Sequence, residues 1–292
     1  MVILLERLHG MGYKKLSSEQ ELQLIEEYKS GISVTSLCEK YGFATKKSIT
    51  DKIKKYYPEQ YDLIVDEARR NRKSYNFRLD IIDSEFDAYY LGLMLTDGYV
   101  TIKHDIGIDL IDEDCIQFLS KSIGKNYAKY DKLYSSEYNR KIISQKHPKY
   151  RLLLNDQDLE KDLARFGVVP NKTKTLTAVS LLKEEEKFIP YIIRGIIDGD
   201  GTVNPTTYGA PQFRIVTYTD DFAQWIKYVL EEKMFMSDIH IRYKNPLYEI
   251  GSAEKTNLLK LIALSYNKPF GMNRKYNELR ETFRDYNKNF FD

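Results

Sequence analysis

Two stretches of the chain are apolar on nearly every side and end abruptly in an aspartate and a glycine. Residues 89–100 read YYLGLMLTDGYV, and residues 192–203 read IIRGIIDGDGTV. A helix that is apolar all round is normally buried, so each stretch predicts a helix at the centre of a domain. Ser84, followed three residues later by Asp87, predicts the start of the first helix. Pro190 is tolerated in the first turn of the second.

The two stretches are the first sign of an internal repeat. Asp97 and Asp200 are 103 residues apart, and Lys172 and Lys275 share this offset because each lies 75 residues after its aspartate. After each Asp-Gly pair, the pattern predicts two strands, a helix with an acidic start, two further strands and a helix. The expected order in each half is αββαββα. The elements that follow the first helix are expected at 99–110, 112–123, around 141–154 and 156–166, and again at 202–219, 220–233, around 239–250 and 253–265.

The residues before the repeats predict a small helical module. Within 17–57 we expect three short helices, the first starting at a capping box formed by Ser18 and Glu21. Ile49 and Ile53 have the spacing of one buried face on the third helix. Two short helices around a glycine-containing turn, the second one basic, are typical of a helix-turn-helix, whose second helix enters the DNA major groove. A plain three-helix bundle is the alternative. The lysines expected to meet DNA are Lys46, Lys47 and Lys54.

A charged segment, DEARRNRKSYNFRLD, separates this module from the repeats. It predicts a basic linker at 66–80, or a helix end followed by an extended arm, in which Arg70 and Arg72 can follow a phosphate backbone. The expected class is therefore α+β, with two pseudo-symmetric repeats and a small all-α N-terminal domain. The expected boundaries are 1–65 for the module, 66–80 for the linker, and 81–183 and 184–292 for the repeats.

Composition narrows the class of protein. With 292 residues and 42% hydrophobic residues, the chain can hold more than one domain. Its longest apolar runs fall short of the roughly 18 residues of a membrane span, and its two cysteines have no metal-like spacing. We therefore expect no membrane partner. The expected setting is a reducing interior, either the cytoplasm (at a nucleoid or in a phage-infected cell) or an organelle.

The net charge of +2 says little about binding partners, but the charged residues are unevenly distributed along the sequence. Residues 80–115 contain ten acidic residues and one basic one, whereas residues 121–151 contain nine basic and two acidic ones. Residues 240–275 contain seven basic and two acidic ones. The basic blocks favour surfaces that bind a polyanion, and the acidic block favours nearby pockets that can hold cations.

The two apolar helices predict a metal site. Gly92 and Gly195 lie in the middle of them, where glycine is costly unless another backbone must approach closely. If the helices pack glycine to glycine, their C-terminal ends emerge together and Asp97 faces Asp200. Two carboxylates with the last-turn carbonyls are hard oxygen ligands that suit Mg²⁺. The expected metal ligands are Asp97, Asp200, Thr96 and Gly199.

The paired lysines complete this site. Lys172 and Lys275 can approach the aspartates from either side and stabilise charge that develops on a phosphodiester. Lys174 is an alternative to Lys172. The expected catalytic residues are therefore Asp97, Asp200, Lys172 and Lys275.

At these residues the chain resembles the LAGLIDADG homing endonucleases, in their single-chain form with two motifs. The matches are YLGLMLTDG at 90–98 and IRGIIDGDG at 193–201. The second is close to the family pattern. The first departs from it at Leu91, Leu95 and Thr96, none of which is the metal-binding position. Segments 166–176 and 272–279 resemble the stretches of this family that carry the active-site lysines.

The resemblance implies a fold, an activity and a partner. Each half would form a curved antiparallel sheet, and the two sheets would make a saddle over double-stranded DNA with a long, nearly asymmetric target site. A monomer would cut both strands with Mg²⁺, with Mn²⁺ able to substitute and Ca²⁺ supporting binding without cleavage. The expected DNA contacts on the strands are Arg140, Gln145, Lys146, Lys149, Gln212, Arg214 and Arg242.

Other functions remain open at this point. One is a nucleic-acid-binding protein that does not cleave: an RNA maturase, or a transcription regulator on an inactive scaffold. A metabolic enzyme with an acidic Mg²⁺ pocket is a weaker alternative, because the strands carry many lysines. The two aspartates and two lysines favour the nuclease, since a pure binder has no need for converging carboxylates that repel DNA. The termini favour a free-standing or intron-encoded protein over an intein.

Overall fold

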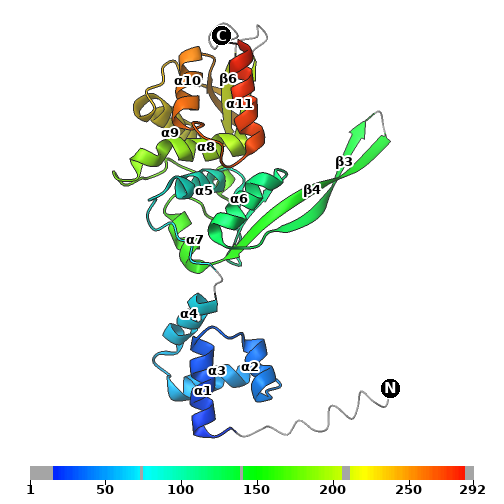
Figure 1. Cartoon of the computed structure of the whole chain (residues 1–292), viewed down its shortest axis with the longest axis vertical. Coiled ribbons are helices and arrows are strands. Elements are labelled where there is room, and N and C mark those ends of the chain that lie inside the picture. Colours follow the sequence, from blue (N-terminus) through cyan, green and yellow to red (C-terminus); the bar gives the residue numbers. More distant parts are fainter. Residues whose placement is uncertain (1–15, 73–74, 139–140, 206–210, 287–292) are drawn as a thin grey trace. The chain divides into compact units, whose positions relative to one another are not determined.

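The structure is a computed structural model that describes residues 16–72, 75–138, 141–205 and 211–286 (Figure 1). The chain divides into two compact units, Met1–Asn76 and Phe77–Asp292. No helix in the described part of the chain is both long and apolar enough to cross a membrane.

The described part of the first unit is a bundle of four helices. These are α1 (Ser18–Lys29), α2 (Val34–Tyr41), α3 (Lys47–Tyr56) and α4 (Tyr61–Arg72). Leu24, Leu37 and Ile53 are fully buried in its core, where each of the first three helices presents one apolar face. The three helices predicted between residues 17 and 57 are therefore present.

Residues 66–72 form the end of α4, because Ala68 is buried in the core with Ile64 one turn earlier. The linker interpretation is therefore wrong for these residues, and its alternative, a helix end, is confirmed. The capping box of α1 was also predicted wrongly, because it is made by Ser17 and Gln20, one residue earlier than expected. The carboxylate of Glu21 instead accepts hydrogen bonds from three side chains of α3, those of Lys52, Lys55 and Tyr56.

The second unit contains the two predicted repeats, and both have the order αββαββα. The first repeat comprises α5 (Glu85–Leu95), β1 (Gly98–Val100), β2 (Asp105–Leu110), α6 (Glu113–Ile123), β3 (Ala128–Tyr138), β4 (Lys141–Asn155) and α7 (Gln157–Ala164). The second comprises α8 (Ile189–Asp200), β5 (Gly201–Pro205), β6 (Pro211–Thr217), α9 (Asp220–Tyr228), β7 (His240–Lys244), β8 (Leu247–Ser252) and α10 (Lys255–Leu264). Three single-turn helices, η1 (Lys172–Lys174), η2 (Glu186–Phe188) and η3 (Val229–Lys233), lie between these elements, and α11 (Asn273–Tyr286) follows them.

Each repeat forms one four-stranded antiparallel sheet. The strand orders are β1-β2-β4-β3 and β5-β6-β8-β7, so the two sheets share one topology. This confirms the predicted α+β class and the internal repeat. Helices α5 and α8 pack against each other between the repeats.

The third and fourth strands differ in length between the repeats. The β3–β4 pair runs from Ala128↔Arg151 to Tyr138↔Lys141, and Figure 1 shows it projecting well beyond the helices. The corresponding β7–β8 pair runs only from His240↔Gly251 to Lys244↔Leu247. The sequence pattern placed this pair of the first repeat around 141–154 and gave no sign that β3 begins as early as Ala128.

Each sheet has an inner face covered by helices and a polar outer face. In β2, Ile106, Ile108 and Leu110 are buried, and the intervening Asp109 points the other way, beside Arg151 of β4. In the second sheet Phe213 and Ile215 are buried, and Gln212 and Arg214 alternate with them along β6. We call the faces that carry Asp109 and Arg214 the outer faces.

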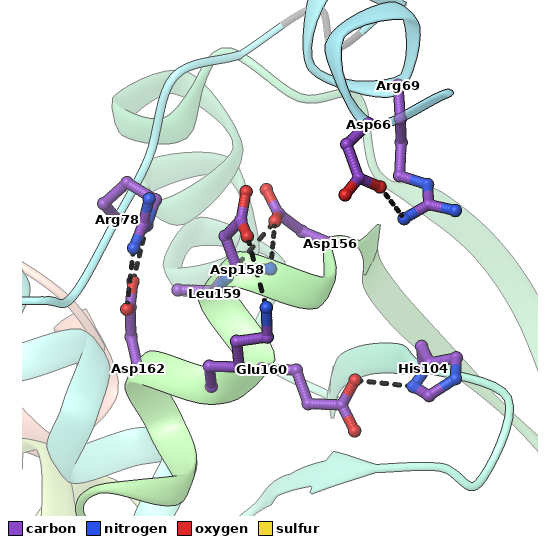
Figure 2. A network of polar contacts seen from close by, with 10 residues as sticks. Asp66, Arg69, Arg78, His104, Asp156, Asp158, Leu159, Glu160 and Asp162 are labelled. Carbon is purple, nitrogen blue, oxygen red and sulfur yellow. Dashed lines mark hydrogen bonds and ion pairs between the residues drawn. The ribbon is translucent and has the colours of Figure 1, made fainter. Parts of the chain in front are cut away.

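Polar contacts fix helix α7 within the first repeat (Figure 2). Arg78 donates two hydrogen bonds to the carboxylate of Asp162, at 2.7 and 2.9 Å. Asp156 caps the start of α7, and Glu160 lies 2.7 Å from the ring nitrogen Nδ1 of His104. These contacts hold in place the end of the repeat that leads to Lys172.

Candidate functional site

The site is built on the contact between α5 and α8. A Cβ atom placed on Gly92 would lie 2.2 Å from the carbonyl oxygen of Ile192 and 2.8 Å from the Cα of Gly195. A Cβ atom placed on Gly195 would lie 2.3 Å from the carbonyl oxygen of Tyr89. Side-chain carbons do not approach backbone atoms so closely, so both positions need glycine. The two helix backbones therefore touch at the glycines, as the sequence predicts.

This contact brings the two helix ends together. Thr96 is the C-cap of α5, and its hydroxyl donates to helix carbonyls within the same turn. Helix α8 continues to Asp200. A Cβ atom placed on Gly199 would lie 2.1 Å from Oγ1 of Thr96 and 3.2 Å from Oδ2 of Asp97. The end of α5 therefore rests against the last turn of α8, next to both aspartates.

The two aspartates influence each other. Burial raises the pKa of Asp200 to about 6, and the negative charge of Asp97 contributes to this shift. Burial also raises the pKa of Asp97, while the nearby charges of Lys172, Lys149 and Lys275 oppose the shift. Both carboxylates are still reached by solvent. They therefore lie at an open site where protein atoms remove part of their hydration.

The two predicted lysines are buried beside the aspartates. Lys172 is 6% exposed, and its ammonium donates to the carbonyl of Thr96 at 2.7 Å. Lys275 is 8% exposed and donates to the carbonyl of Gly201. Burial lowers the pKa of both ammonium groups. Lys174, the alternative to Lys172, is exposed, with its ammonium 5.7 Å from the centre of the Tyr218 ring.

The donor atoms of this site fit Mg²⁺ but leave most coordination positions to other ligands. Among the described residues, no group of three or more His, Cys, Asp or Glu side chains is placed to hold a metal. Asp97 and Asp200 would supply two carboxylates, and Mg²⁺ normally keeps several waters. The carbonyl of Thr96, an expected ligand, already accepts a hydrogen bond from Lys172. The carbonyl of Gly199 lies in the last turn of α8, where helix carbonyls lack partners within the helix.

The other acid of the second motif has a different environment. Asp198 is 1% exposed and accepts hydrogen bonds from the hydroxyls of Tyr89 at 2.8 Å and Tyr266 at 2.7 Å. Burial raises its pKa to about 6. Arg194, also fully buried, donates to three backbone carbonyls, including those of Ser265 and Lys268. Asp198 and Arg194 therefore belong to the interior, and sequence patterns gave no sign of this network.

The outer face of the first sheet carries part of the predicted DNA contacts. Lys149 lies on β4, and its positive charge opposes the effect of burial on the pKa of both Asp97 and Asp109, so it is close enough to act on both carboxylates. Arg151, on the same face of β4, donates two hydrogen bonds of 2.7 Å to Asp109. Arg140 lies outside the described residues, as do the side chains of Gln145 and Lys146.

The outer face of the second sheet has a similar arrangement. Gln212 and Arg214 lie on β6, and Arg242 is exposed on β7. Glu249 of β8 is 8% exposed, and its carboxylate lies 2.8 Å from the ammonium of Lys244 and 3.7 Å from the guanidinium of Arg214. On both outer faces, an acidic side chain thus orients basic ones. Alternation along the strands could have identified these acids.

In the first unit, the lysines of α3 fall into two groups. Lys52 and Lys55 are bound to Glu21 and lower its pKa to about 2. The expected contacts Lys46, Lys47 and Lys54 are exposed. Of the expected contacts on α4, Arg70 is exposed, and the guanidinium of Arg72 lies 4.8 Å from the centre of the Tyr28 ring.

No protein-family model matches the chain. One curated relative, the DNA-directed RNA polymerase subunit Rpo1C of Methanocaldococcus jannaschii, is 29% identical over 126 residues. This segment is 42% of the present chain, and the chain spans only 13% of the polymerase subunit.

Three solved structures have a similar fold. The homing endonuclease I-WcaI, bound to its DNA recognition sequence, is 13% identical with a TM-score of 0.46, covering 69% of this chain and 88% of its own. The LAGLIDADG meganuclease I-AabMI, bound to uncleaved DNA, is 11% identical with a TM-score of 0.43, covering 70% and 92%. The N-terminal LAGLIDADG domain of DUF199/WhiA is 11% identical with a TM-score of 0.41, covering 64% and 83%.

The fold assignment follows from the molecule's own topology. Two repeats share one element order and one strand order, and their first helices meet at glycines and end in Asp97 and Asp200. This is the two-repeat architecture that the resemblance to the LAGLIDADG homing endonucleases predicts.

Proposed function

We propose that the protein is a site-specific endonuclease that hydrolyses phosphodiester bonds in both strands of double-stranded DNA with a divalent metal, Mg²⁺. The observation that carries this proposal is the meeting of two carboxylates and two buried lysines at the ends of α5 and α8. Burial and the negative charge of Asp97 both raise the pKa of Asp200, so the folded protein keeps the two carboxylates together at a cost. A cation bound between the carboxylates offsets that cost.

The residues of the site have separate tasks. Asp97 and Asp200 would hold Mg²⁺, which when bound polarises a phosphoryl oxygen and lowers the pKa of coordinated water. The buried ammonium groups of Lys172 and Lys275 can donate to phosphate oxygens and stabilise charge in the transition state. Each ammonium is already held by a backbone carbonyl, that of Thr96 or that of Gly201, so little reorganisation is needed when DNA arrives. We expect Mn²⁺ to substitute, and Ca²⁺ to support binding alone.

The second candidate function is nucleic-acid binding without cleavage, as an RNA maturase or a transcription regulator. The outer faces, where Arg151 and Lys244 stand beside acids, suit either role. A pure binder, however, gains nothing from two solvent-accessible carboxylates that repel the DNA backbone. The aspartate pair therefore favours the nuclease.

A cleavage assay on a library of DNA sites tests the proposal. The full-length protein is incubated with the library and Mg²⁺, and the DNA ends are sequenced. We expect breaks at one defined sequence in both strands, and none in the presence of Ca²⁺. Tight binding with no breaks in Mg²⁺ or Mn²⁺ would exclude the nuclease and leave the non-cleaving alternative.

The unequal strand lengths support a nearly asymmetric target. Strand β3 has 11 residues and β7 has 5. At roughly 3.3 Å per residue these strands span about 36 and 17 Å, or roughly ten and five base pairs at 3.4 Å each. We therefore propose that the first repeat covers the longer half-site. Because one chain supplies both repeats, the active form is expected to be a monomer.

We also propose that the first unit contacts DNA through α3. Replacing Lys47 and Lys54 together by glutamate is expected to weaken DNA binding and to reduce the salt dependence of log K by about 0.9 for each phosphate that is no longer neutralised. Fluorescence anisotropy at several salt concentrations measures both quantities. The double variant Lys161→Glu and Lys187→Glu, with the same change in net charge on exposed residues of the second unit, is the matched control. An equal reduction in both variants would show that α3 makes no direct contact.

A further inference from the structure

The segment that carries each buried lysine is fastened to the opposite repeat. Lys275 lies in the first turn of α11, which belongs to the second repeat. Its neighbour Arg274 donates two hydrogen bonds, of 2.9 and 3.0 Å, to the carboxylate of Asp112 in the first repeat. The backbone N–H of Asn273 donates to Asp114 at 2.9 Å. The two residues directly before Lys275 are thus tied to the start of α6.

Packing strengthens this attachment. Gly271 has φ +75°, and a Cβ atom placed there would lie 2.4 Å from the ring of Tyr89 in the first repeat. The next residue, Met272, donates its backbone N–H to the buried carboxylate of Asp198 at 3.3 Å. The segment before Lys275 therefore has contacts on both sides, and its path to the lysine is fixed.

Lys172 has a counterpart of this attachment. Its segment belongs to the first repeat, and the hydroxyl of Thr219 in the second repeat donates to the carbonyl of Leu176 at 2.5 Å. The backbone from Lys172 to Leu176 forms a hydrogen-bonded turn, because the N–H of Leu176 donates to the carbonyl of Lys172 at 2.9 Å. The hydrogen bond at Leu176 therefore also restrains the position of Lys172, one turn earlier.

The two attachments use equivalent positions. Asp112 is the N-cap of α6, and Thr219 is the N-cap of α9, the corresponding helix of the other repeat. Neither side chain makes a capping hydrogen bond to its own helix. Both are instead directed to the lysine segment of the opposite repeat. The attachment of Arg274 to Asp112 is the stronger of the two, because a bidentate Arg–carboxylate pair is stronger and more specific than a single neutral hydrogen bond such as that of Thr219.

We propose that each active-site lysine is positioned by the opposite repeat: Lys275 through Arg274 and Asp112, and Lys172 through Leu176 and Thr219. The three side chains at these attachments, Asp112, Arg274 and Thr219, are positioning residues, because each acts on a lysine through the segment that carries it. The claim that these attachments affect catalysis rests on the proposed nuclease function. The claim that they fix the position of the lysines is independent of it.

The first test measures lysine accessibility without DNA. The full-length protein is treated with a limiting amount of an amine-acylating reagent, and modification of each lysine is quantified by peptide mass spectrometry. In Asp112→Asn, we expect Lys275 to be modified about tenfold faster while Lys172 is unchanged. In Thr219→Val, we expect a smaller increase, confined to Lys172. Equal increases at both lysines, or no increase at either, would overturn the proposal.

The second test measures each DNA strand separately. On a plasmid with one cleavage site, Asp112→Asn and Arg274→Gln are expected to slow the cutting of one strand at least about tenfold more than the other, so that nicked circles accumulate. Thr219→Val is expected to favour a nick in the opposite strand. The charge swap Asp112→Arg with Arg274→Asp should restore balanced cutting. A purely structural contact would slow both strands equally.

The two tests separate this inference from the proposed function. If the unmodified protein makes no breaks, the nuclease proposal fails, and lysine accessibility still decides whether the attachments position the lysines. If the protein cuts both strands but all variants remain balanced, the nuclease stands and the positioning role in catalysis is wrong. Arg274→Lys keeps the positive charge but loses the bidentate geometry, so it is expected to retain only part of the protection of Lys275.

Discussion

Asp200→Asn is expected to abolish DNA cleavage while leaving DNA binding nearly intact, and Asp97→Asn is expected to do the same. Asparagine keeps the size of the side chain and removes the charge that a divalent cation needs. Metal-assisted charge stabilisation contributes several kcal/mol, and 1.4 kcal/mol corresponds to a factor of ten in rate. We therefore expect the rate to fall by about a thousandfold or more. The measurement is single-turnover cleavage with Mg²⁺, beside binding measured with Ca²⁺.

Asp198→Asn is the matched control, because it changes an acid in the same motif. Asp198 is buried and accepts two tyrosine hydroxyls, so its replacement should lower thermal stability. Cleavage at a temperature where the variant stays folded should fall by no more than about tenfold, because asparagine keeps an oxygen that can accept from the Met272 N–H before Lys275, and a lost buried hydrogen bond costs only about 1–3 kcal/mol. If Asp198→Asn abolished cleavage and Asp200→Asn did not, the assignment of the metal-binding acids would be reversed.

The raised pKa of Asp200 also means that the ionised aspartate pair lowers the stability of the folded protein. An aspartate whose pKa is raised on folding binds its proton more tightly in the folded state, so stability falls as the pH rises from the unfolded pKa of 3.8 to the folded pKa of about 6, above which the loss is complete. Both Asp97 and Asp200 are solvent-accessible, so solvent screens part of this cost. A site that keeps two such carboxylates together is expected to serve a cation.

The fold was largely predictable because its signals are local. The apolar helices carry glycines at matching positions, and a glycine inside a buried helix indicates close packing without any knowledge of the partner. The 103-residue offset then pairs Asp97 with Asp200 and Lys172 with Lys275. The structure places all four close together. The two repeats have the same fold, so residues related by this offset lie at equivalent positions in the two halves.

Other features depend on contacts between segments far apart in the sequence. The sequence pattern does not reveal that Asp112 holds Arg274, since these residues are 162 positions apart and lie in different repeats. The length of β3 was missed for a related reason. Residues 128–132, the part of β3 whose burial the structure describes, are almost all exposed, so they lack the alternation that marks a half-buried strand. The same weakness affects strand register, where an error of one residue moves a side chain to the opposite face.

Gly195→Ala is expected to destabilise the second unit, although alanine is the better helix former. In an exposed helix this substitution stabilises by about 1 kcal/mol. Here the new methyl group would lie 2.3 Å from the carbonyl oxygen of Tyr89 and 2.8 Å from the Cα of Gly92, both backbone atoms. Overpacking typically costs about 1–3 kcal/mol, and more where backbone must move. We expect a net destabilisation of about 2 kcal/mol, and a larger one for Gly195→Val.

Unfolding by urea, followed by the fluorescence of Trp225, measures this destabilisation. Trp225 is the only tryptophan of the chain and is buried in the second unit, so the signal reports on that unit alone. Gly42→Ala is the control: it belongs to the first unit, where the φ of +72° strains alanine although no neighbour lies within 4 Å of the added carbon, so any destabilisation is confined to that unit. It should leave the Trp225 transition unchanged.

The sign of the effect decides between two arrangements of the helices. If α5 and α8 touch through their backbones, Gly195→Ala and Gly92→Ala must both destabilise, and each must separate the ends that hold Asp97 and Asp200. DNA cleavage should then fall even where the protein is still folded, because a displacement of about 1 Å at a catalytic group can cost about a hundredfold in rate. If side chains separated the helices instead, alanine would raise the urea midpoint and leave cleavage unchanged. That result would contradict the contact between the two helix ends on which the proposed metal site depends.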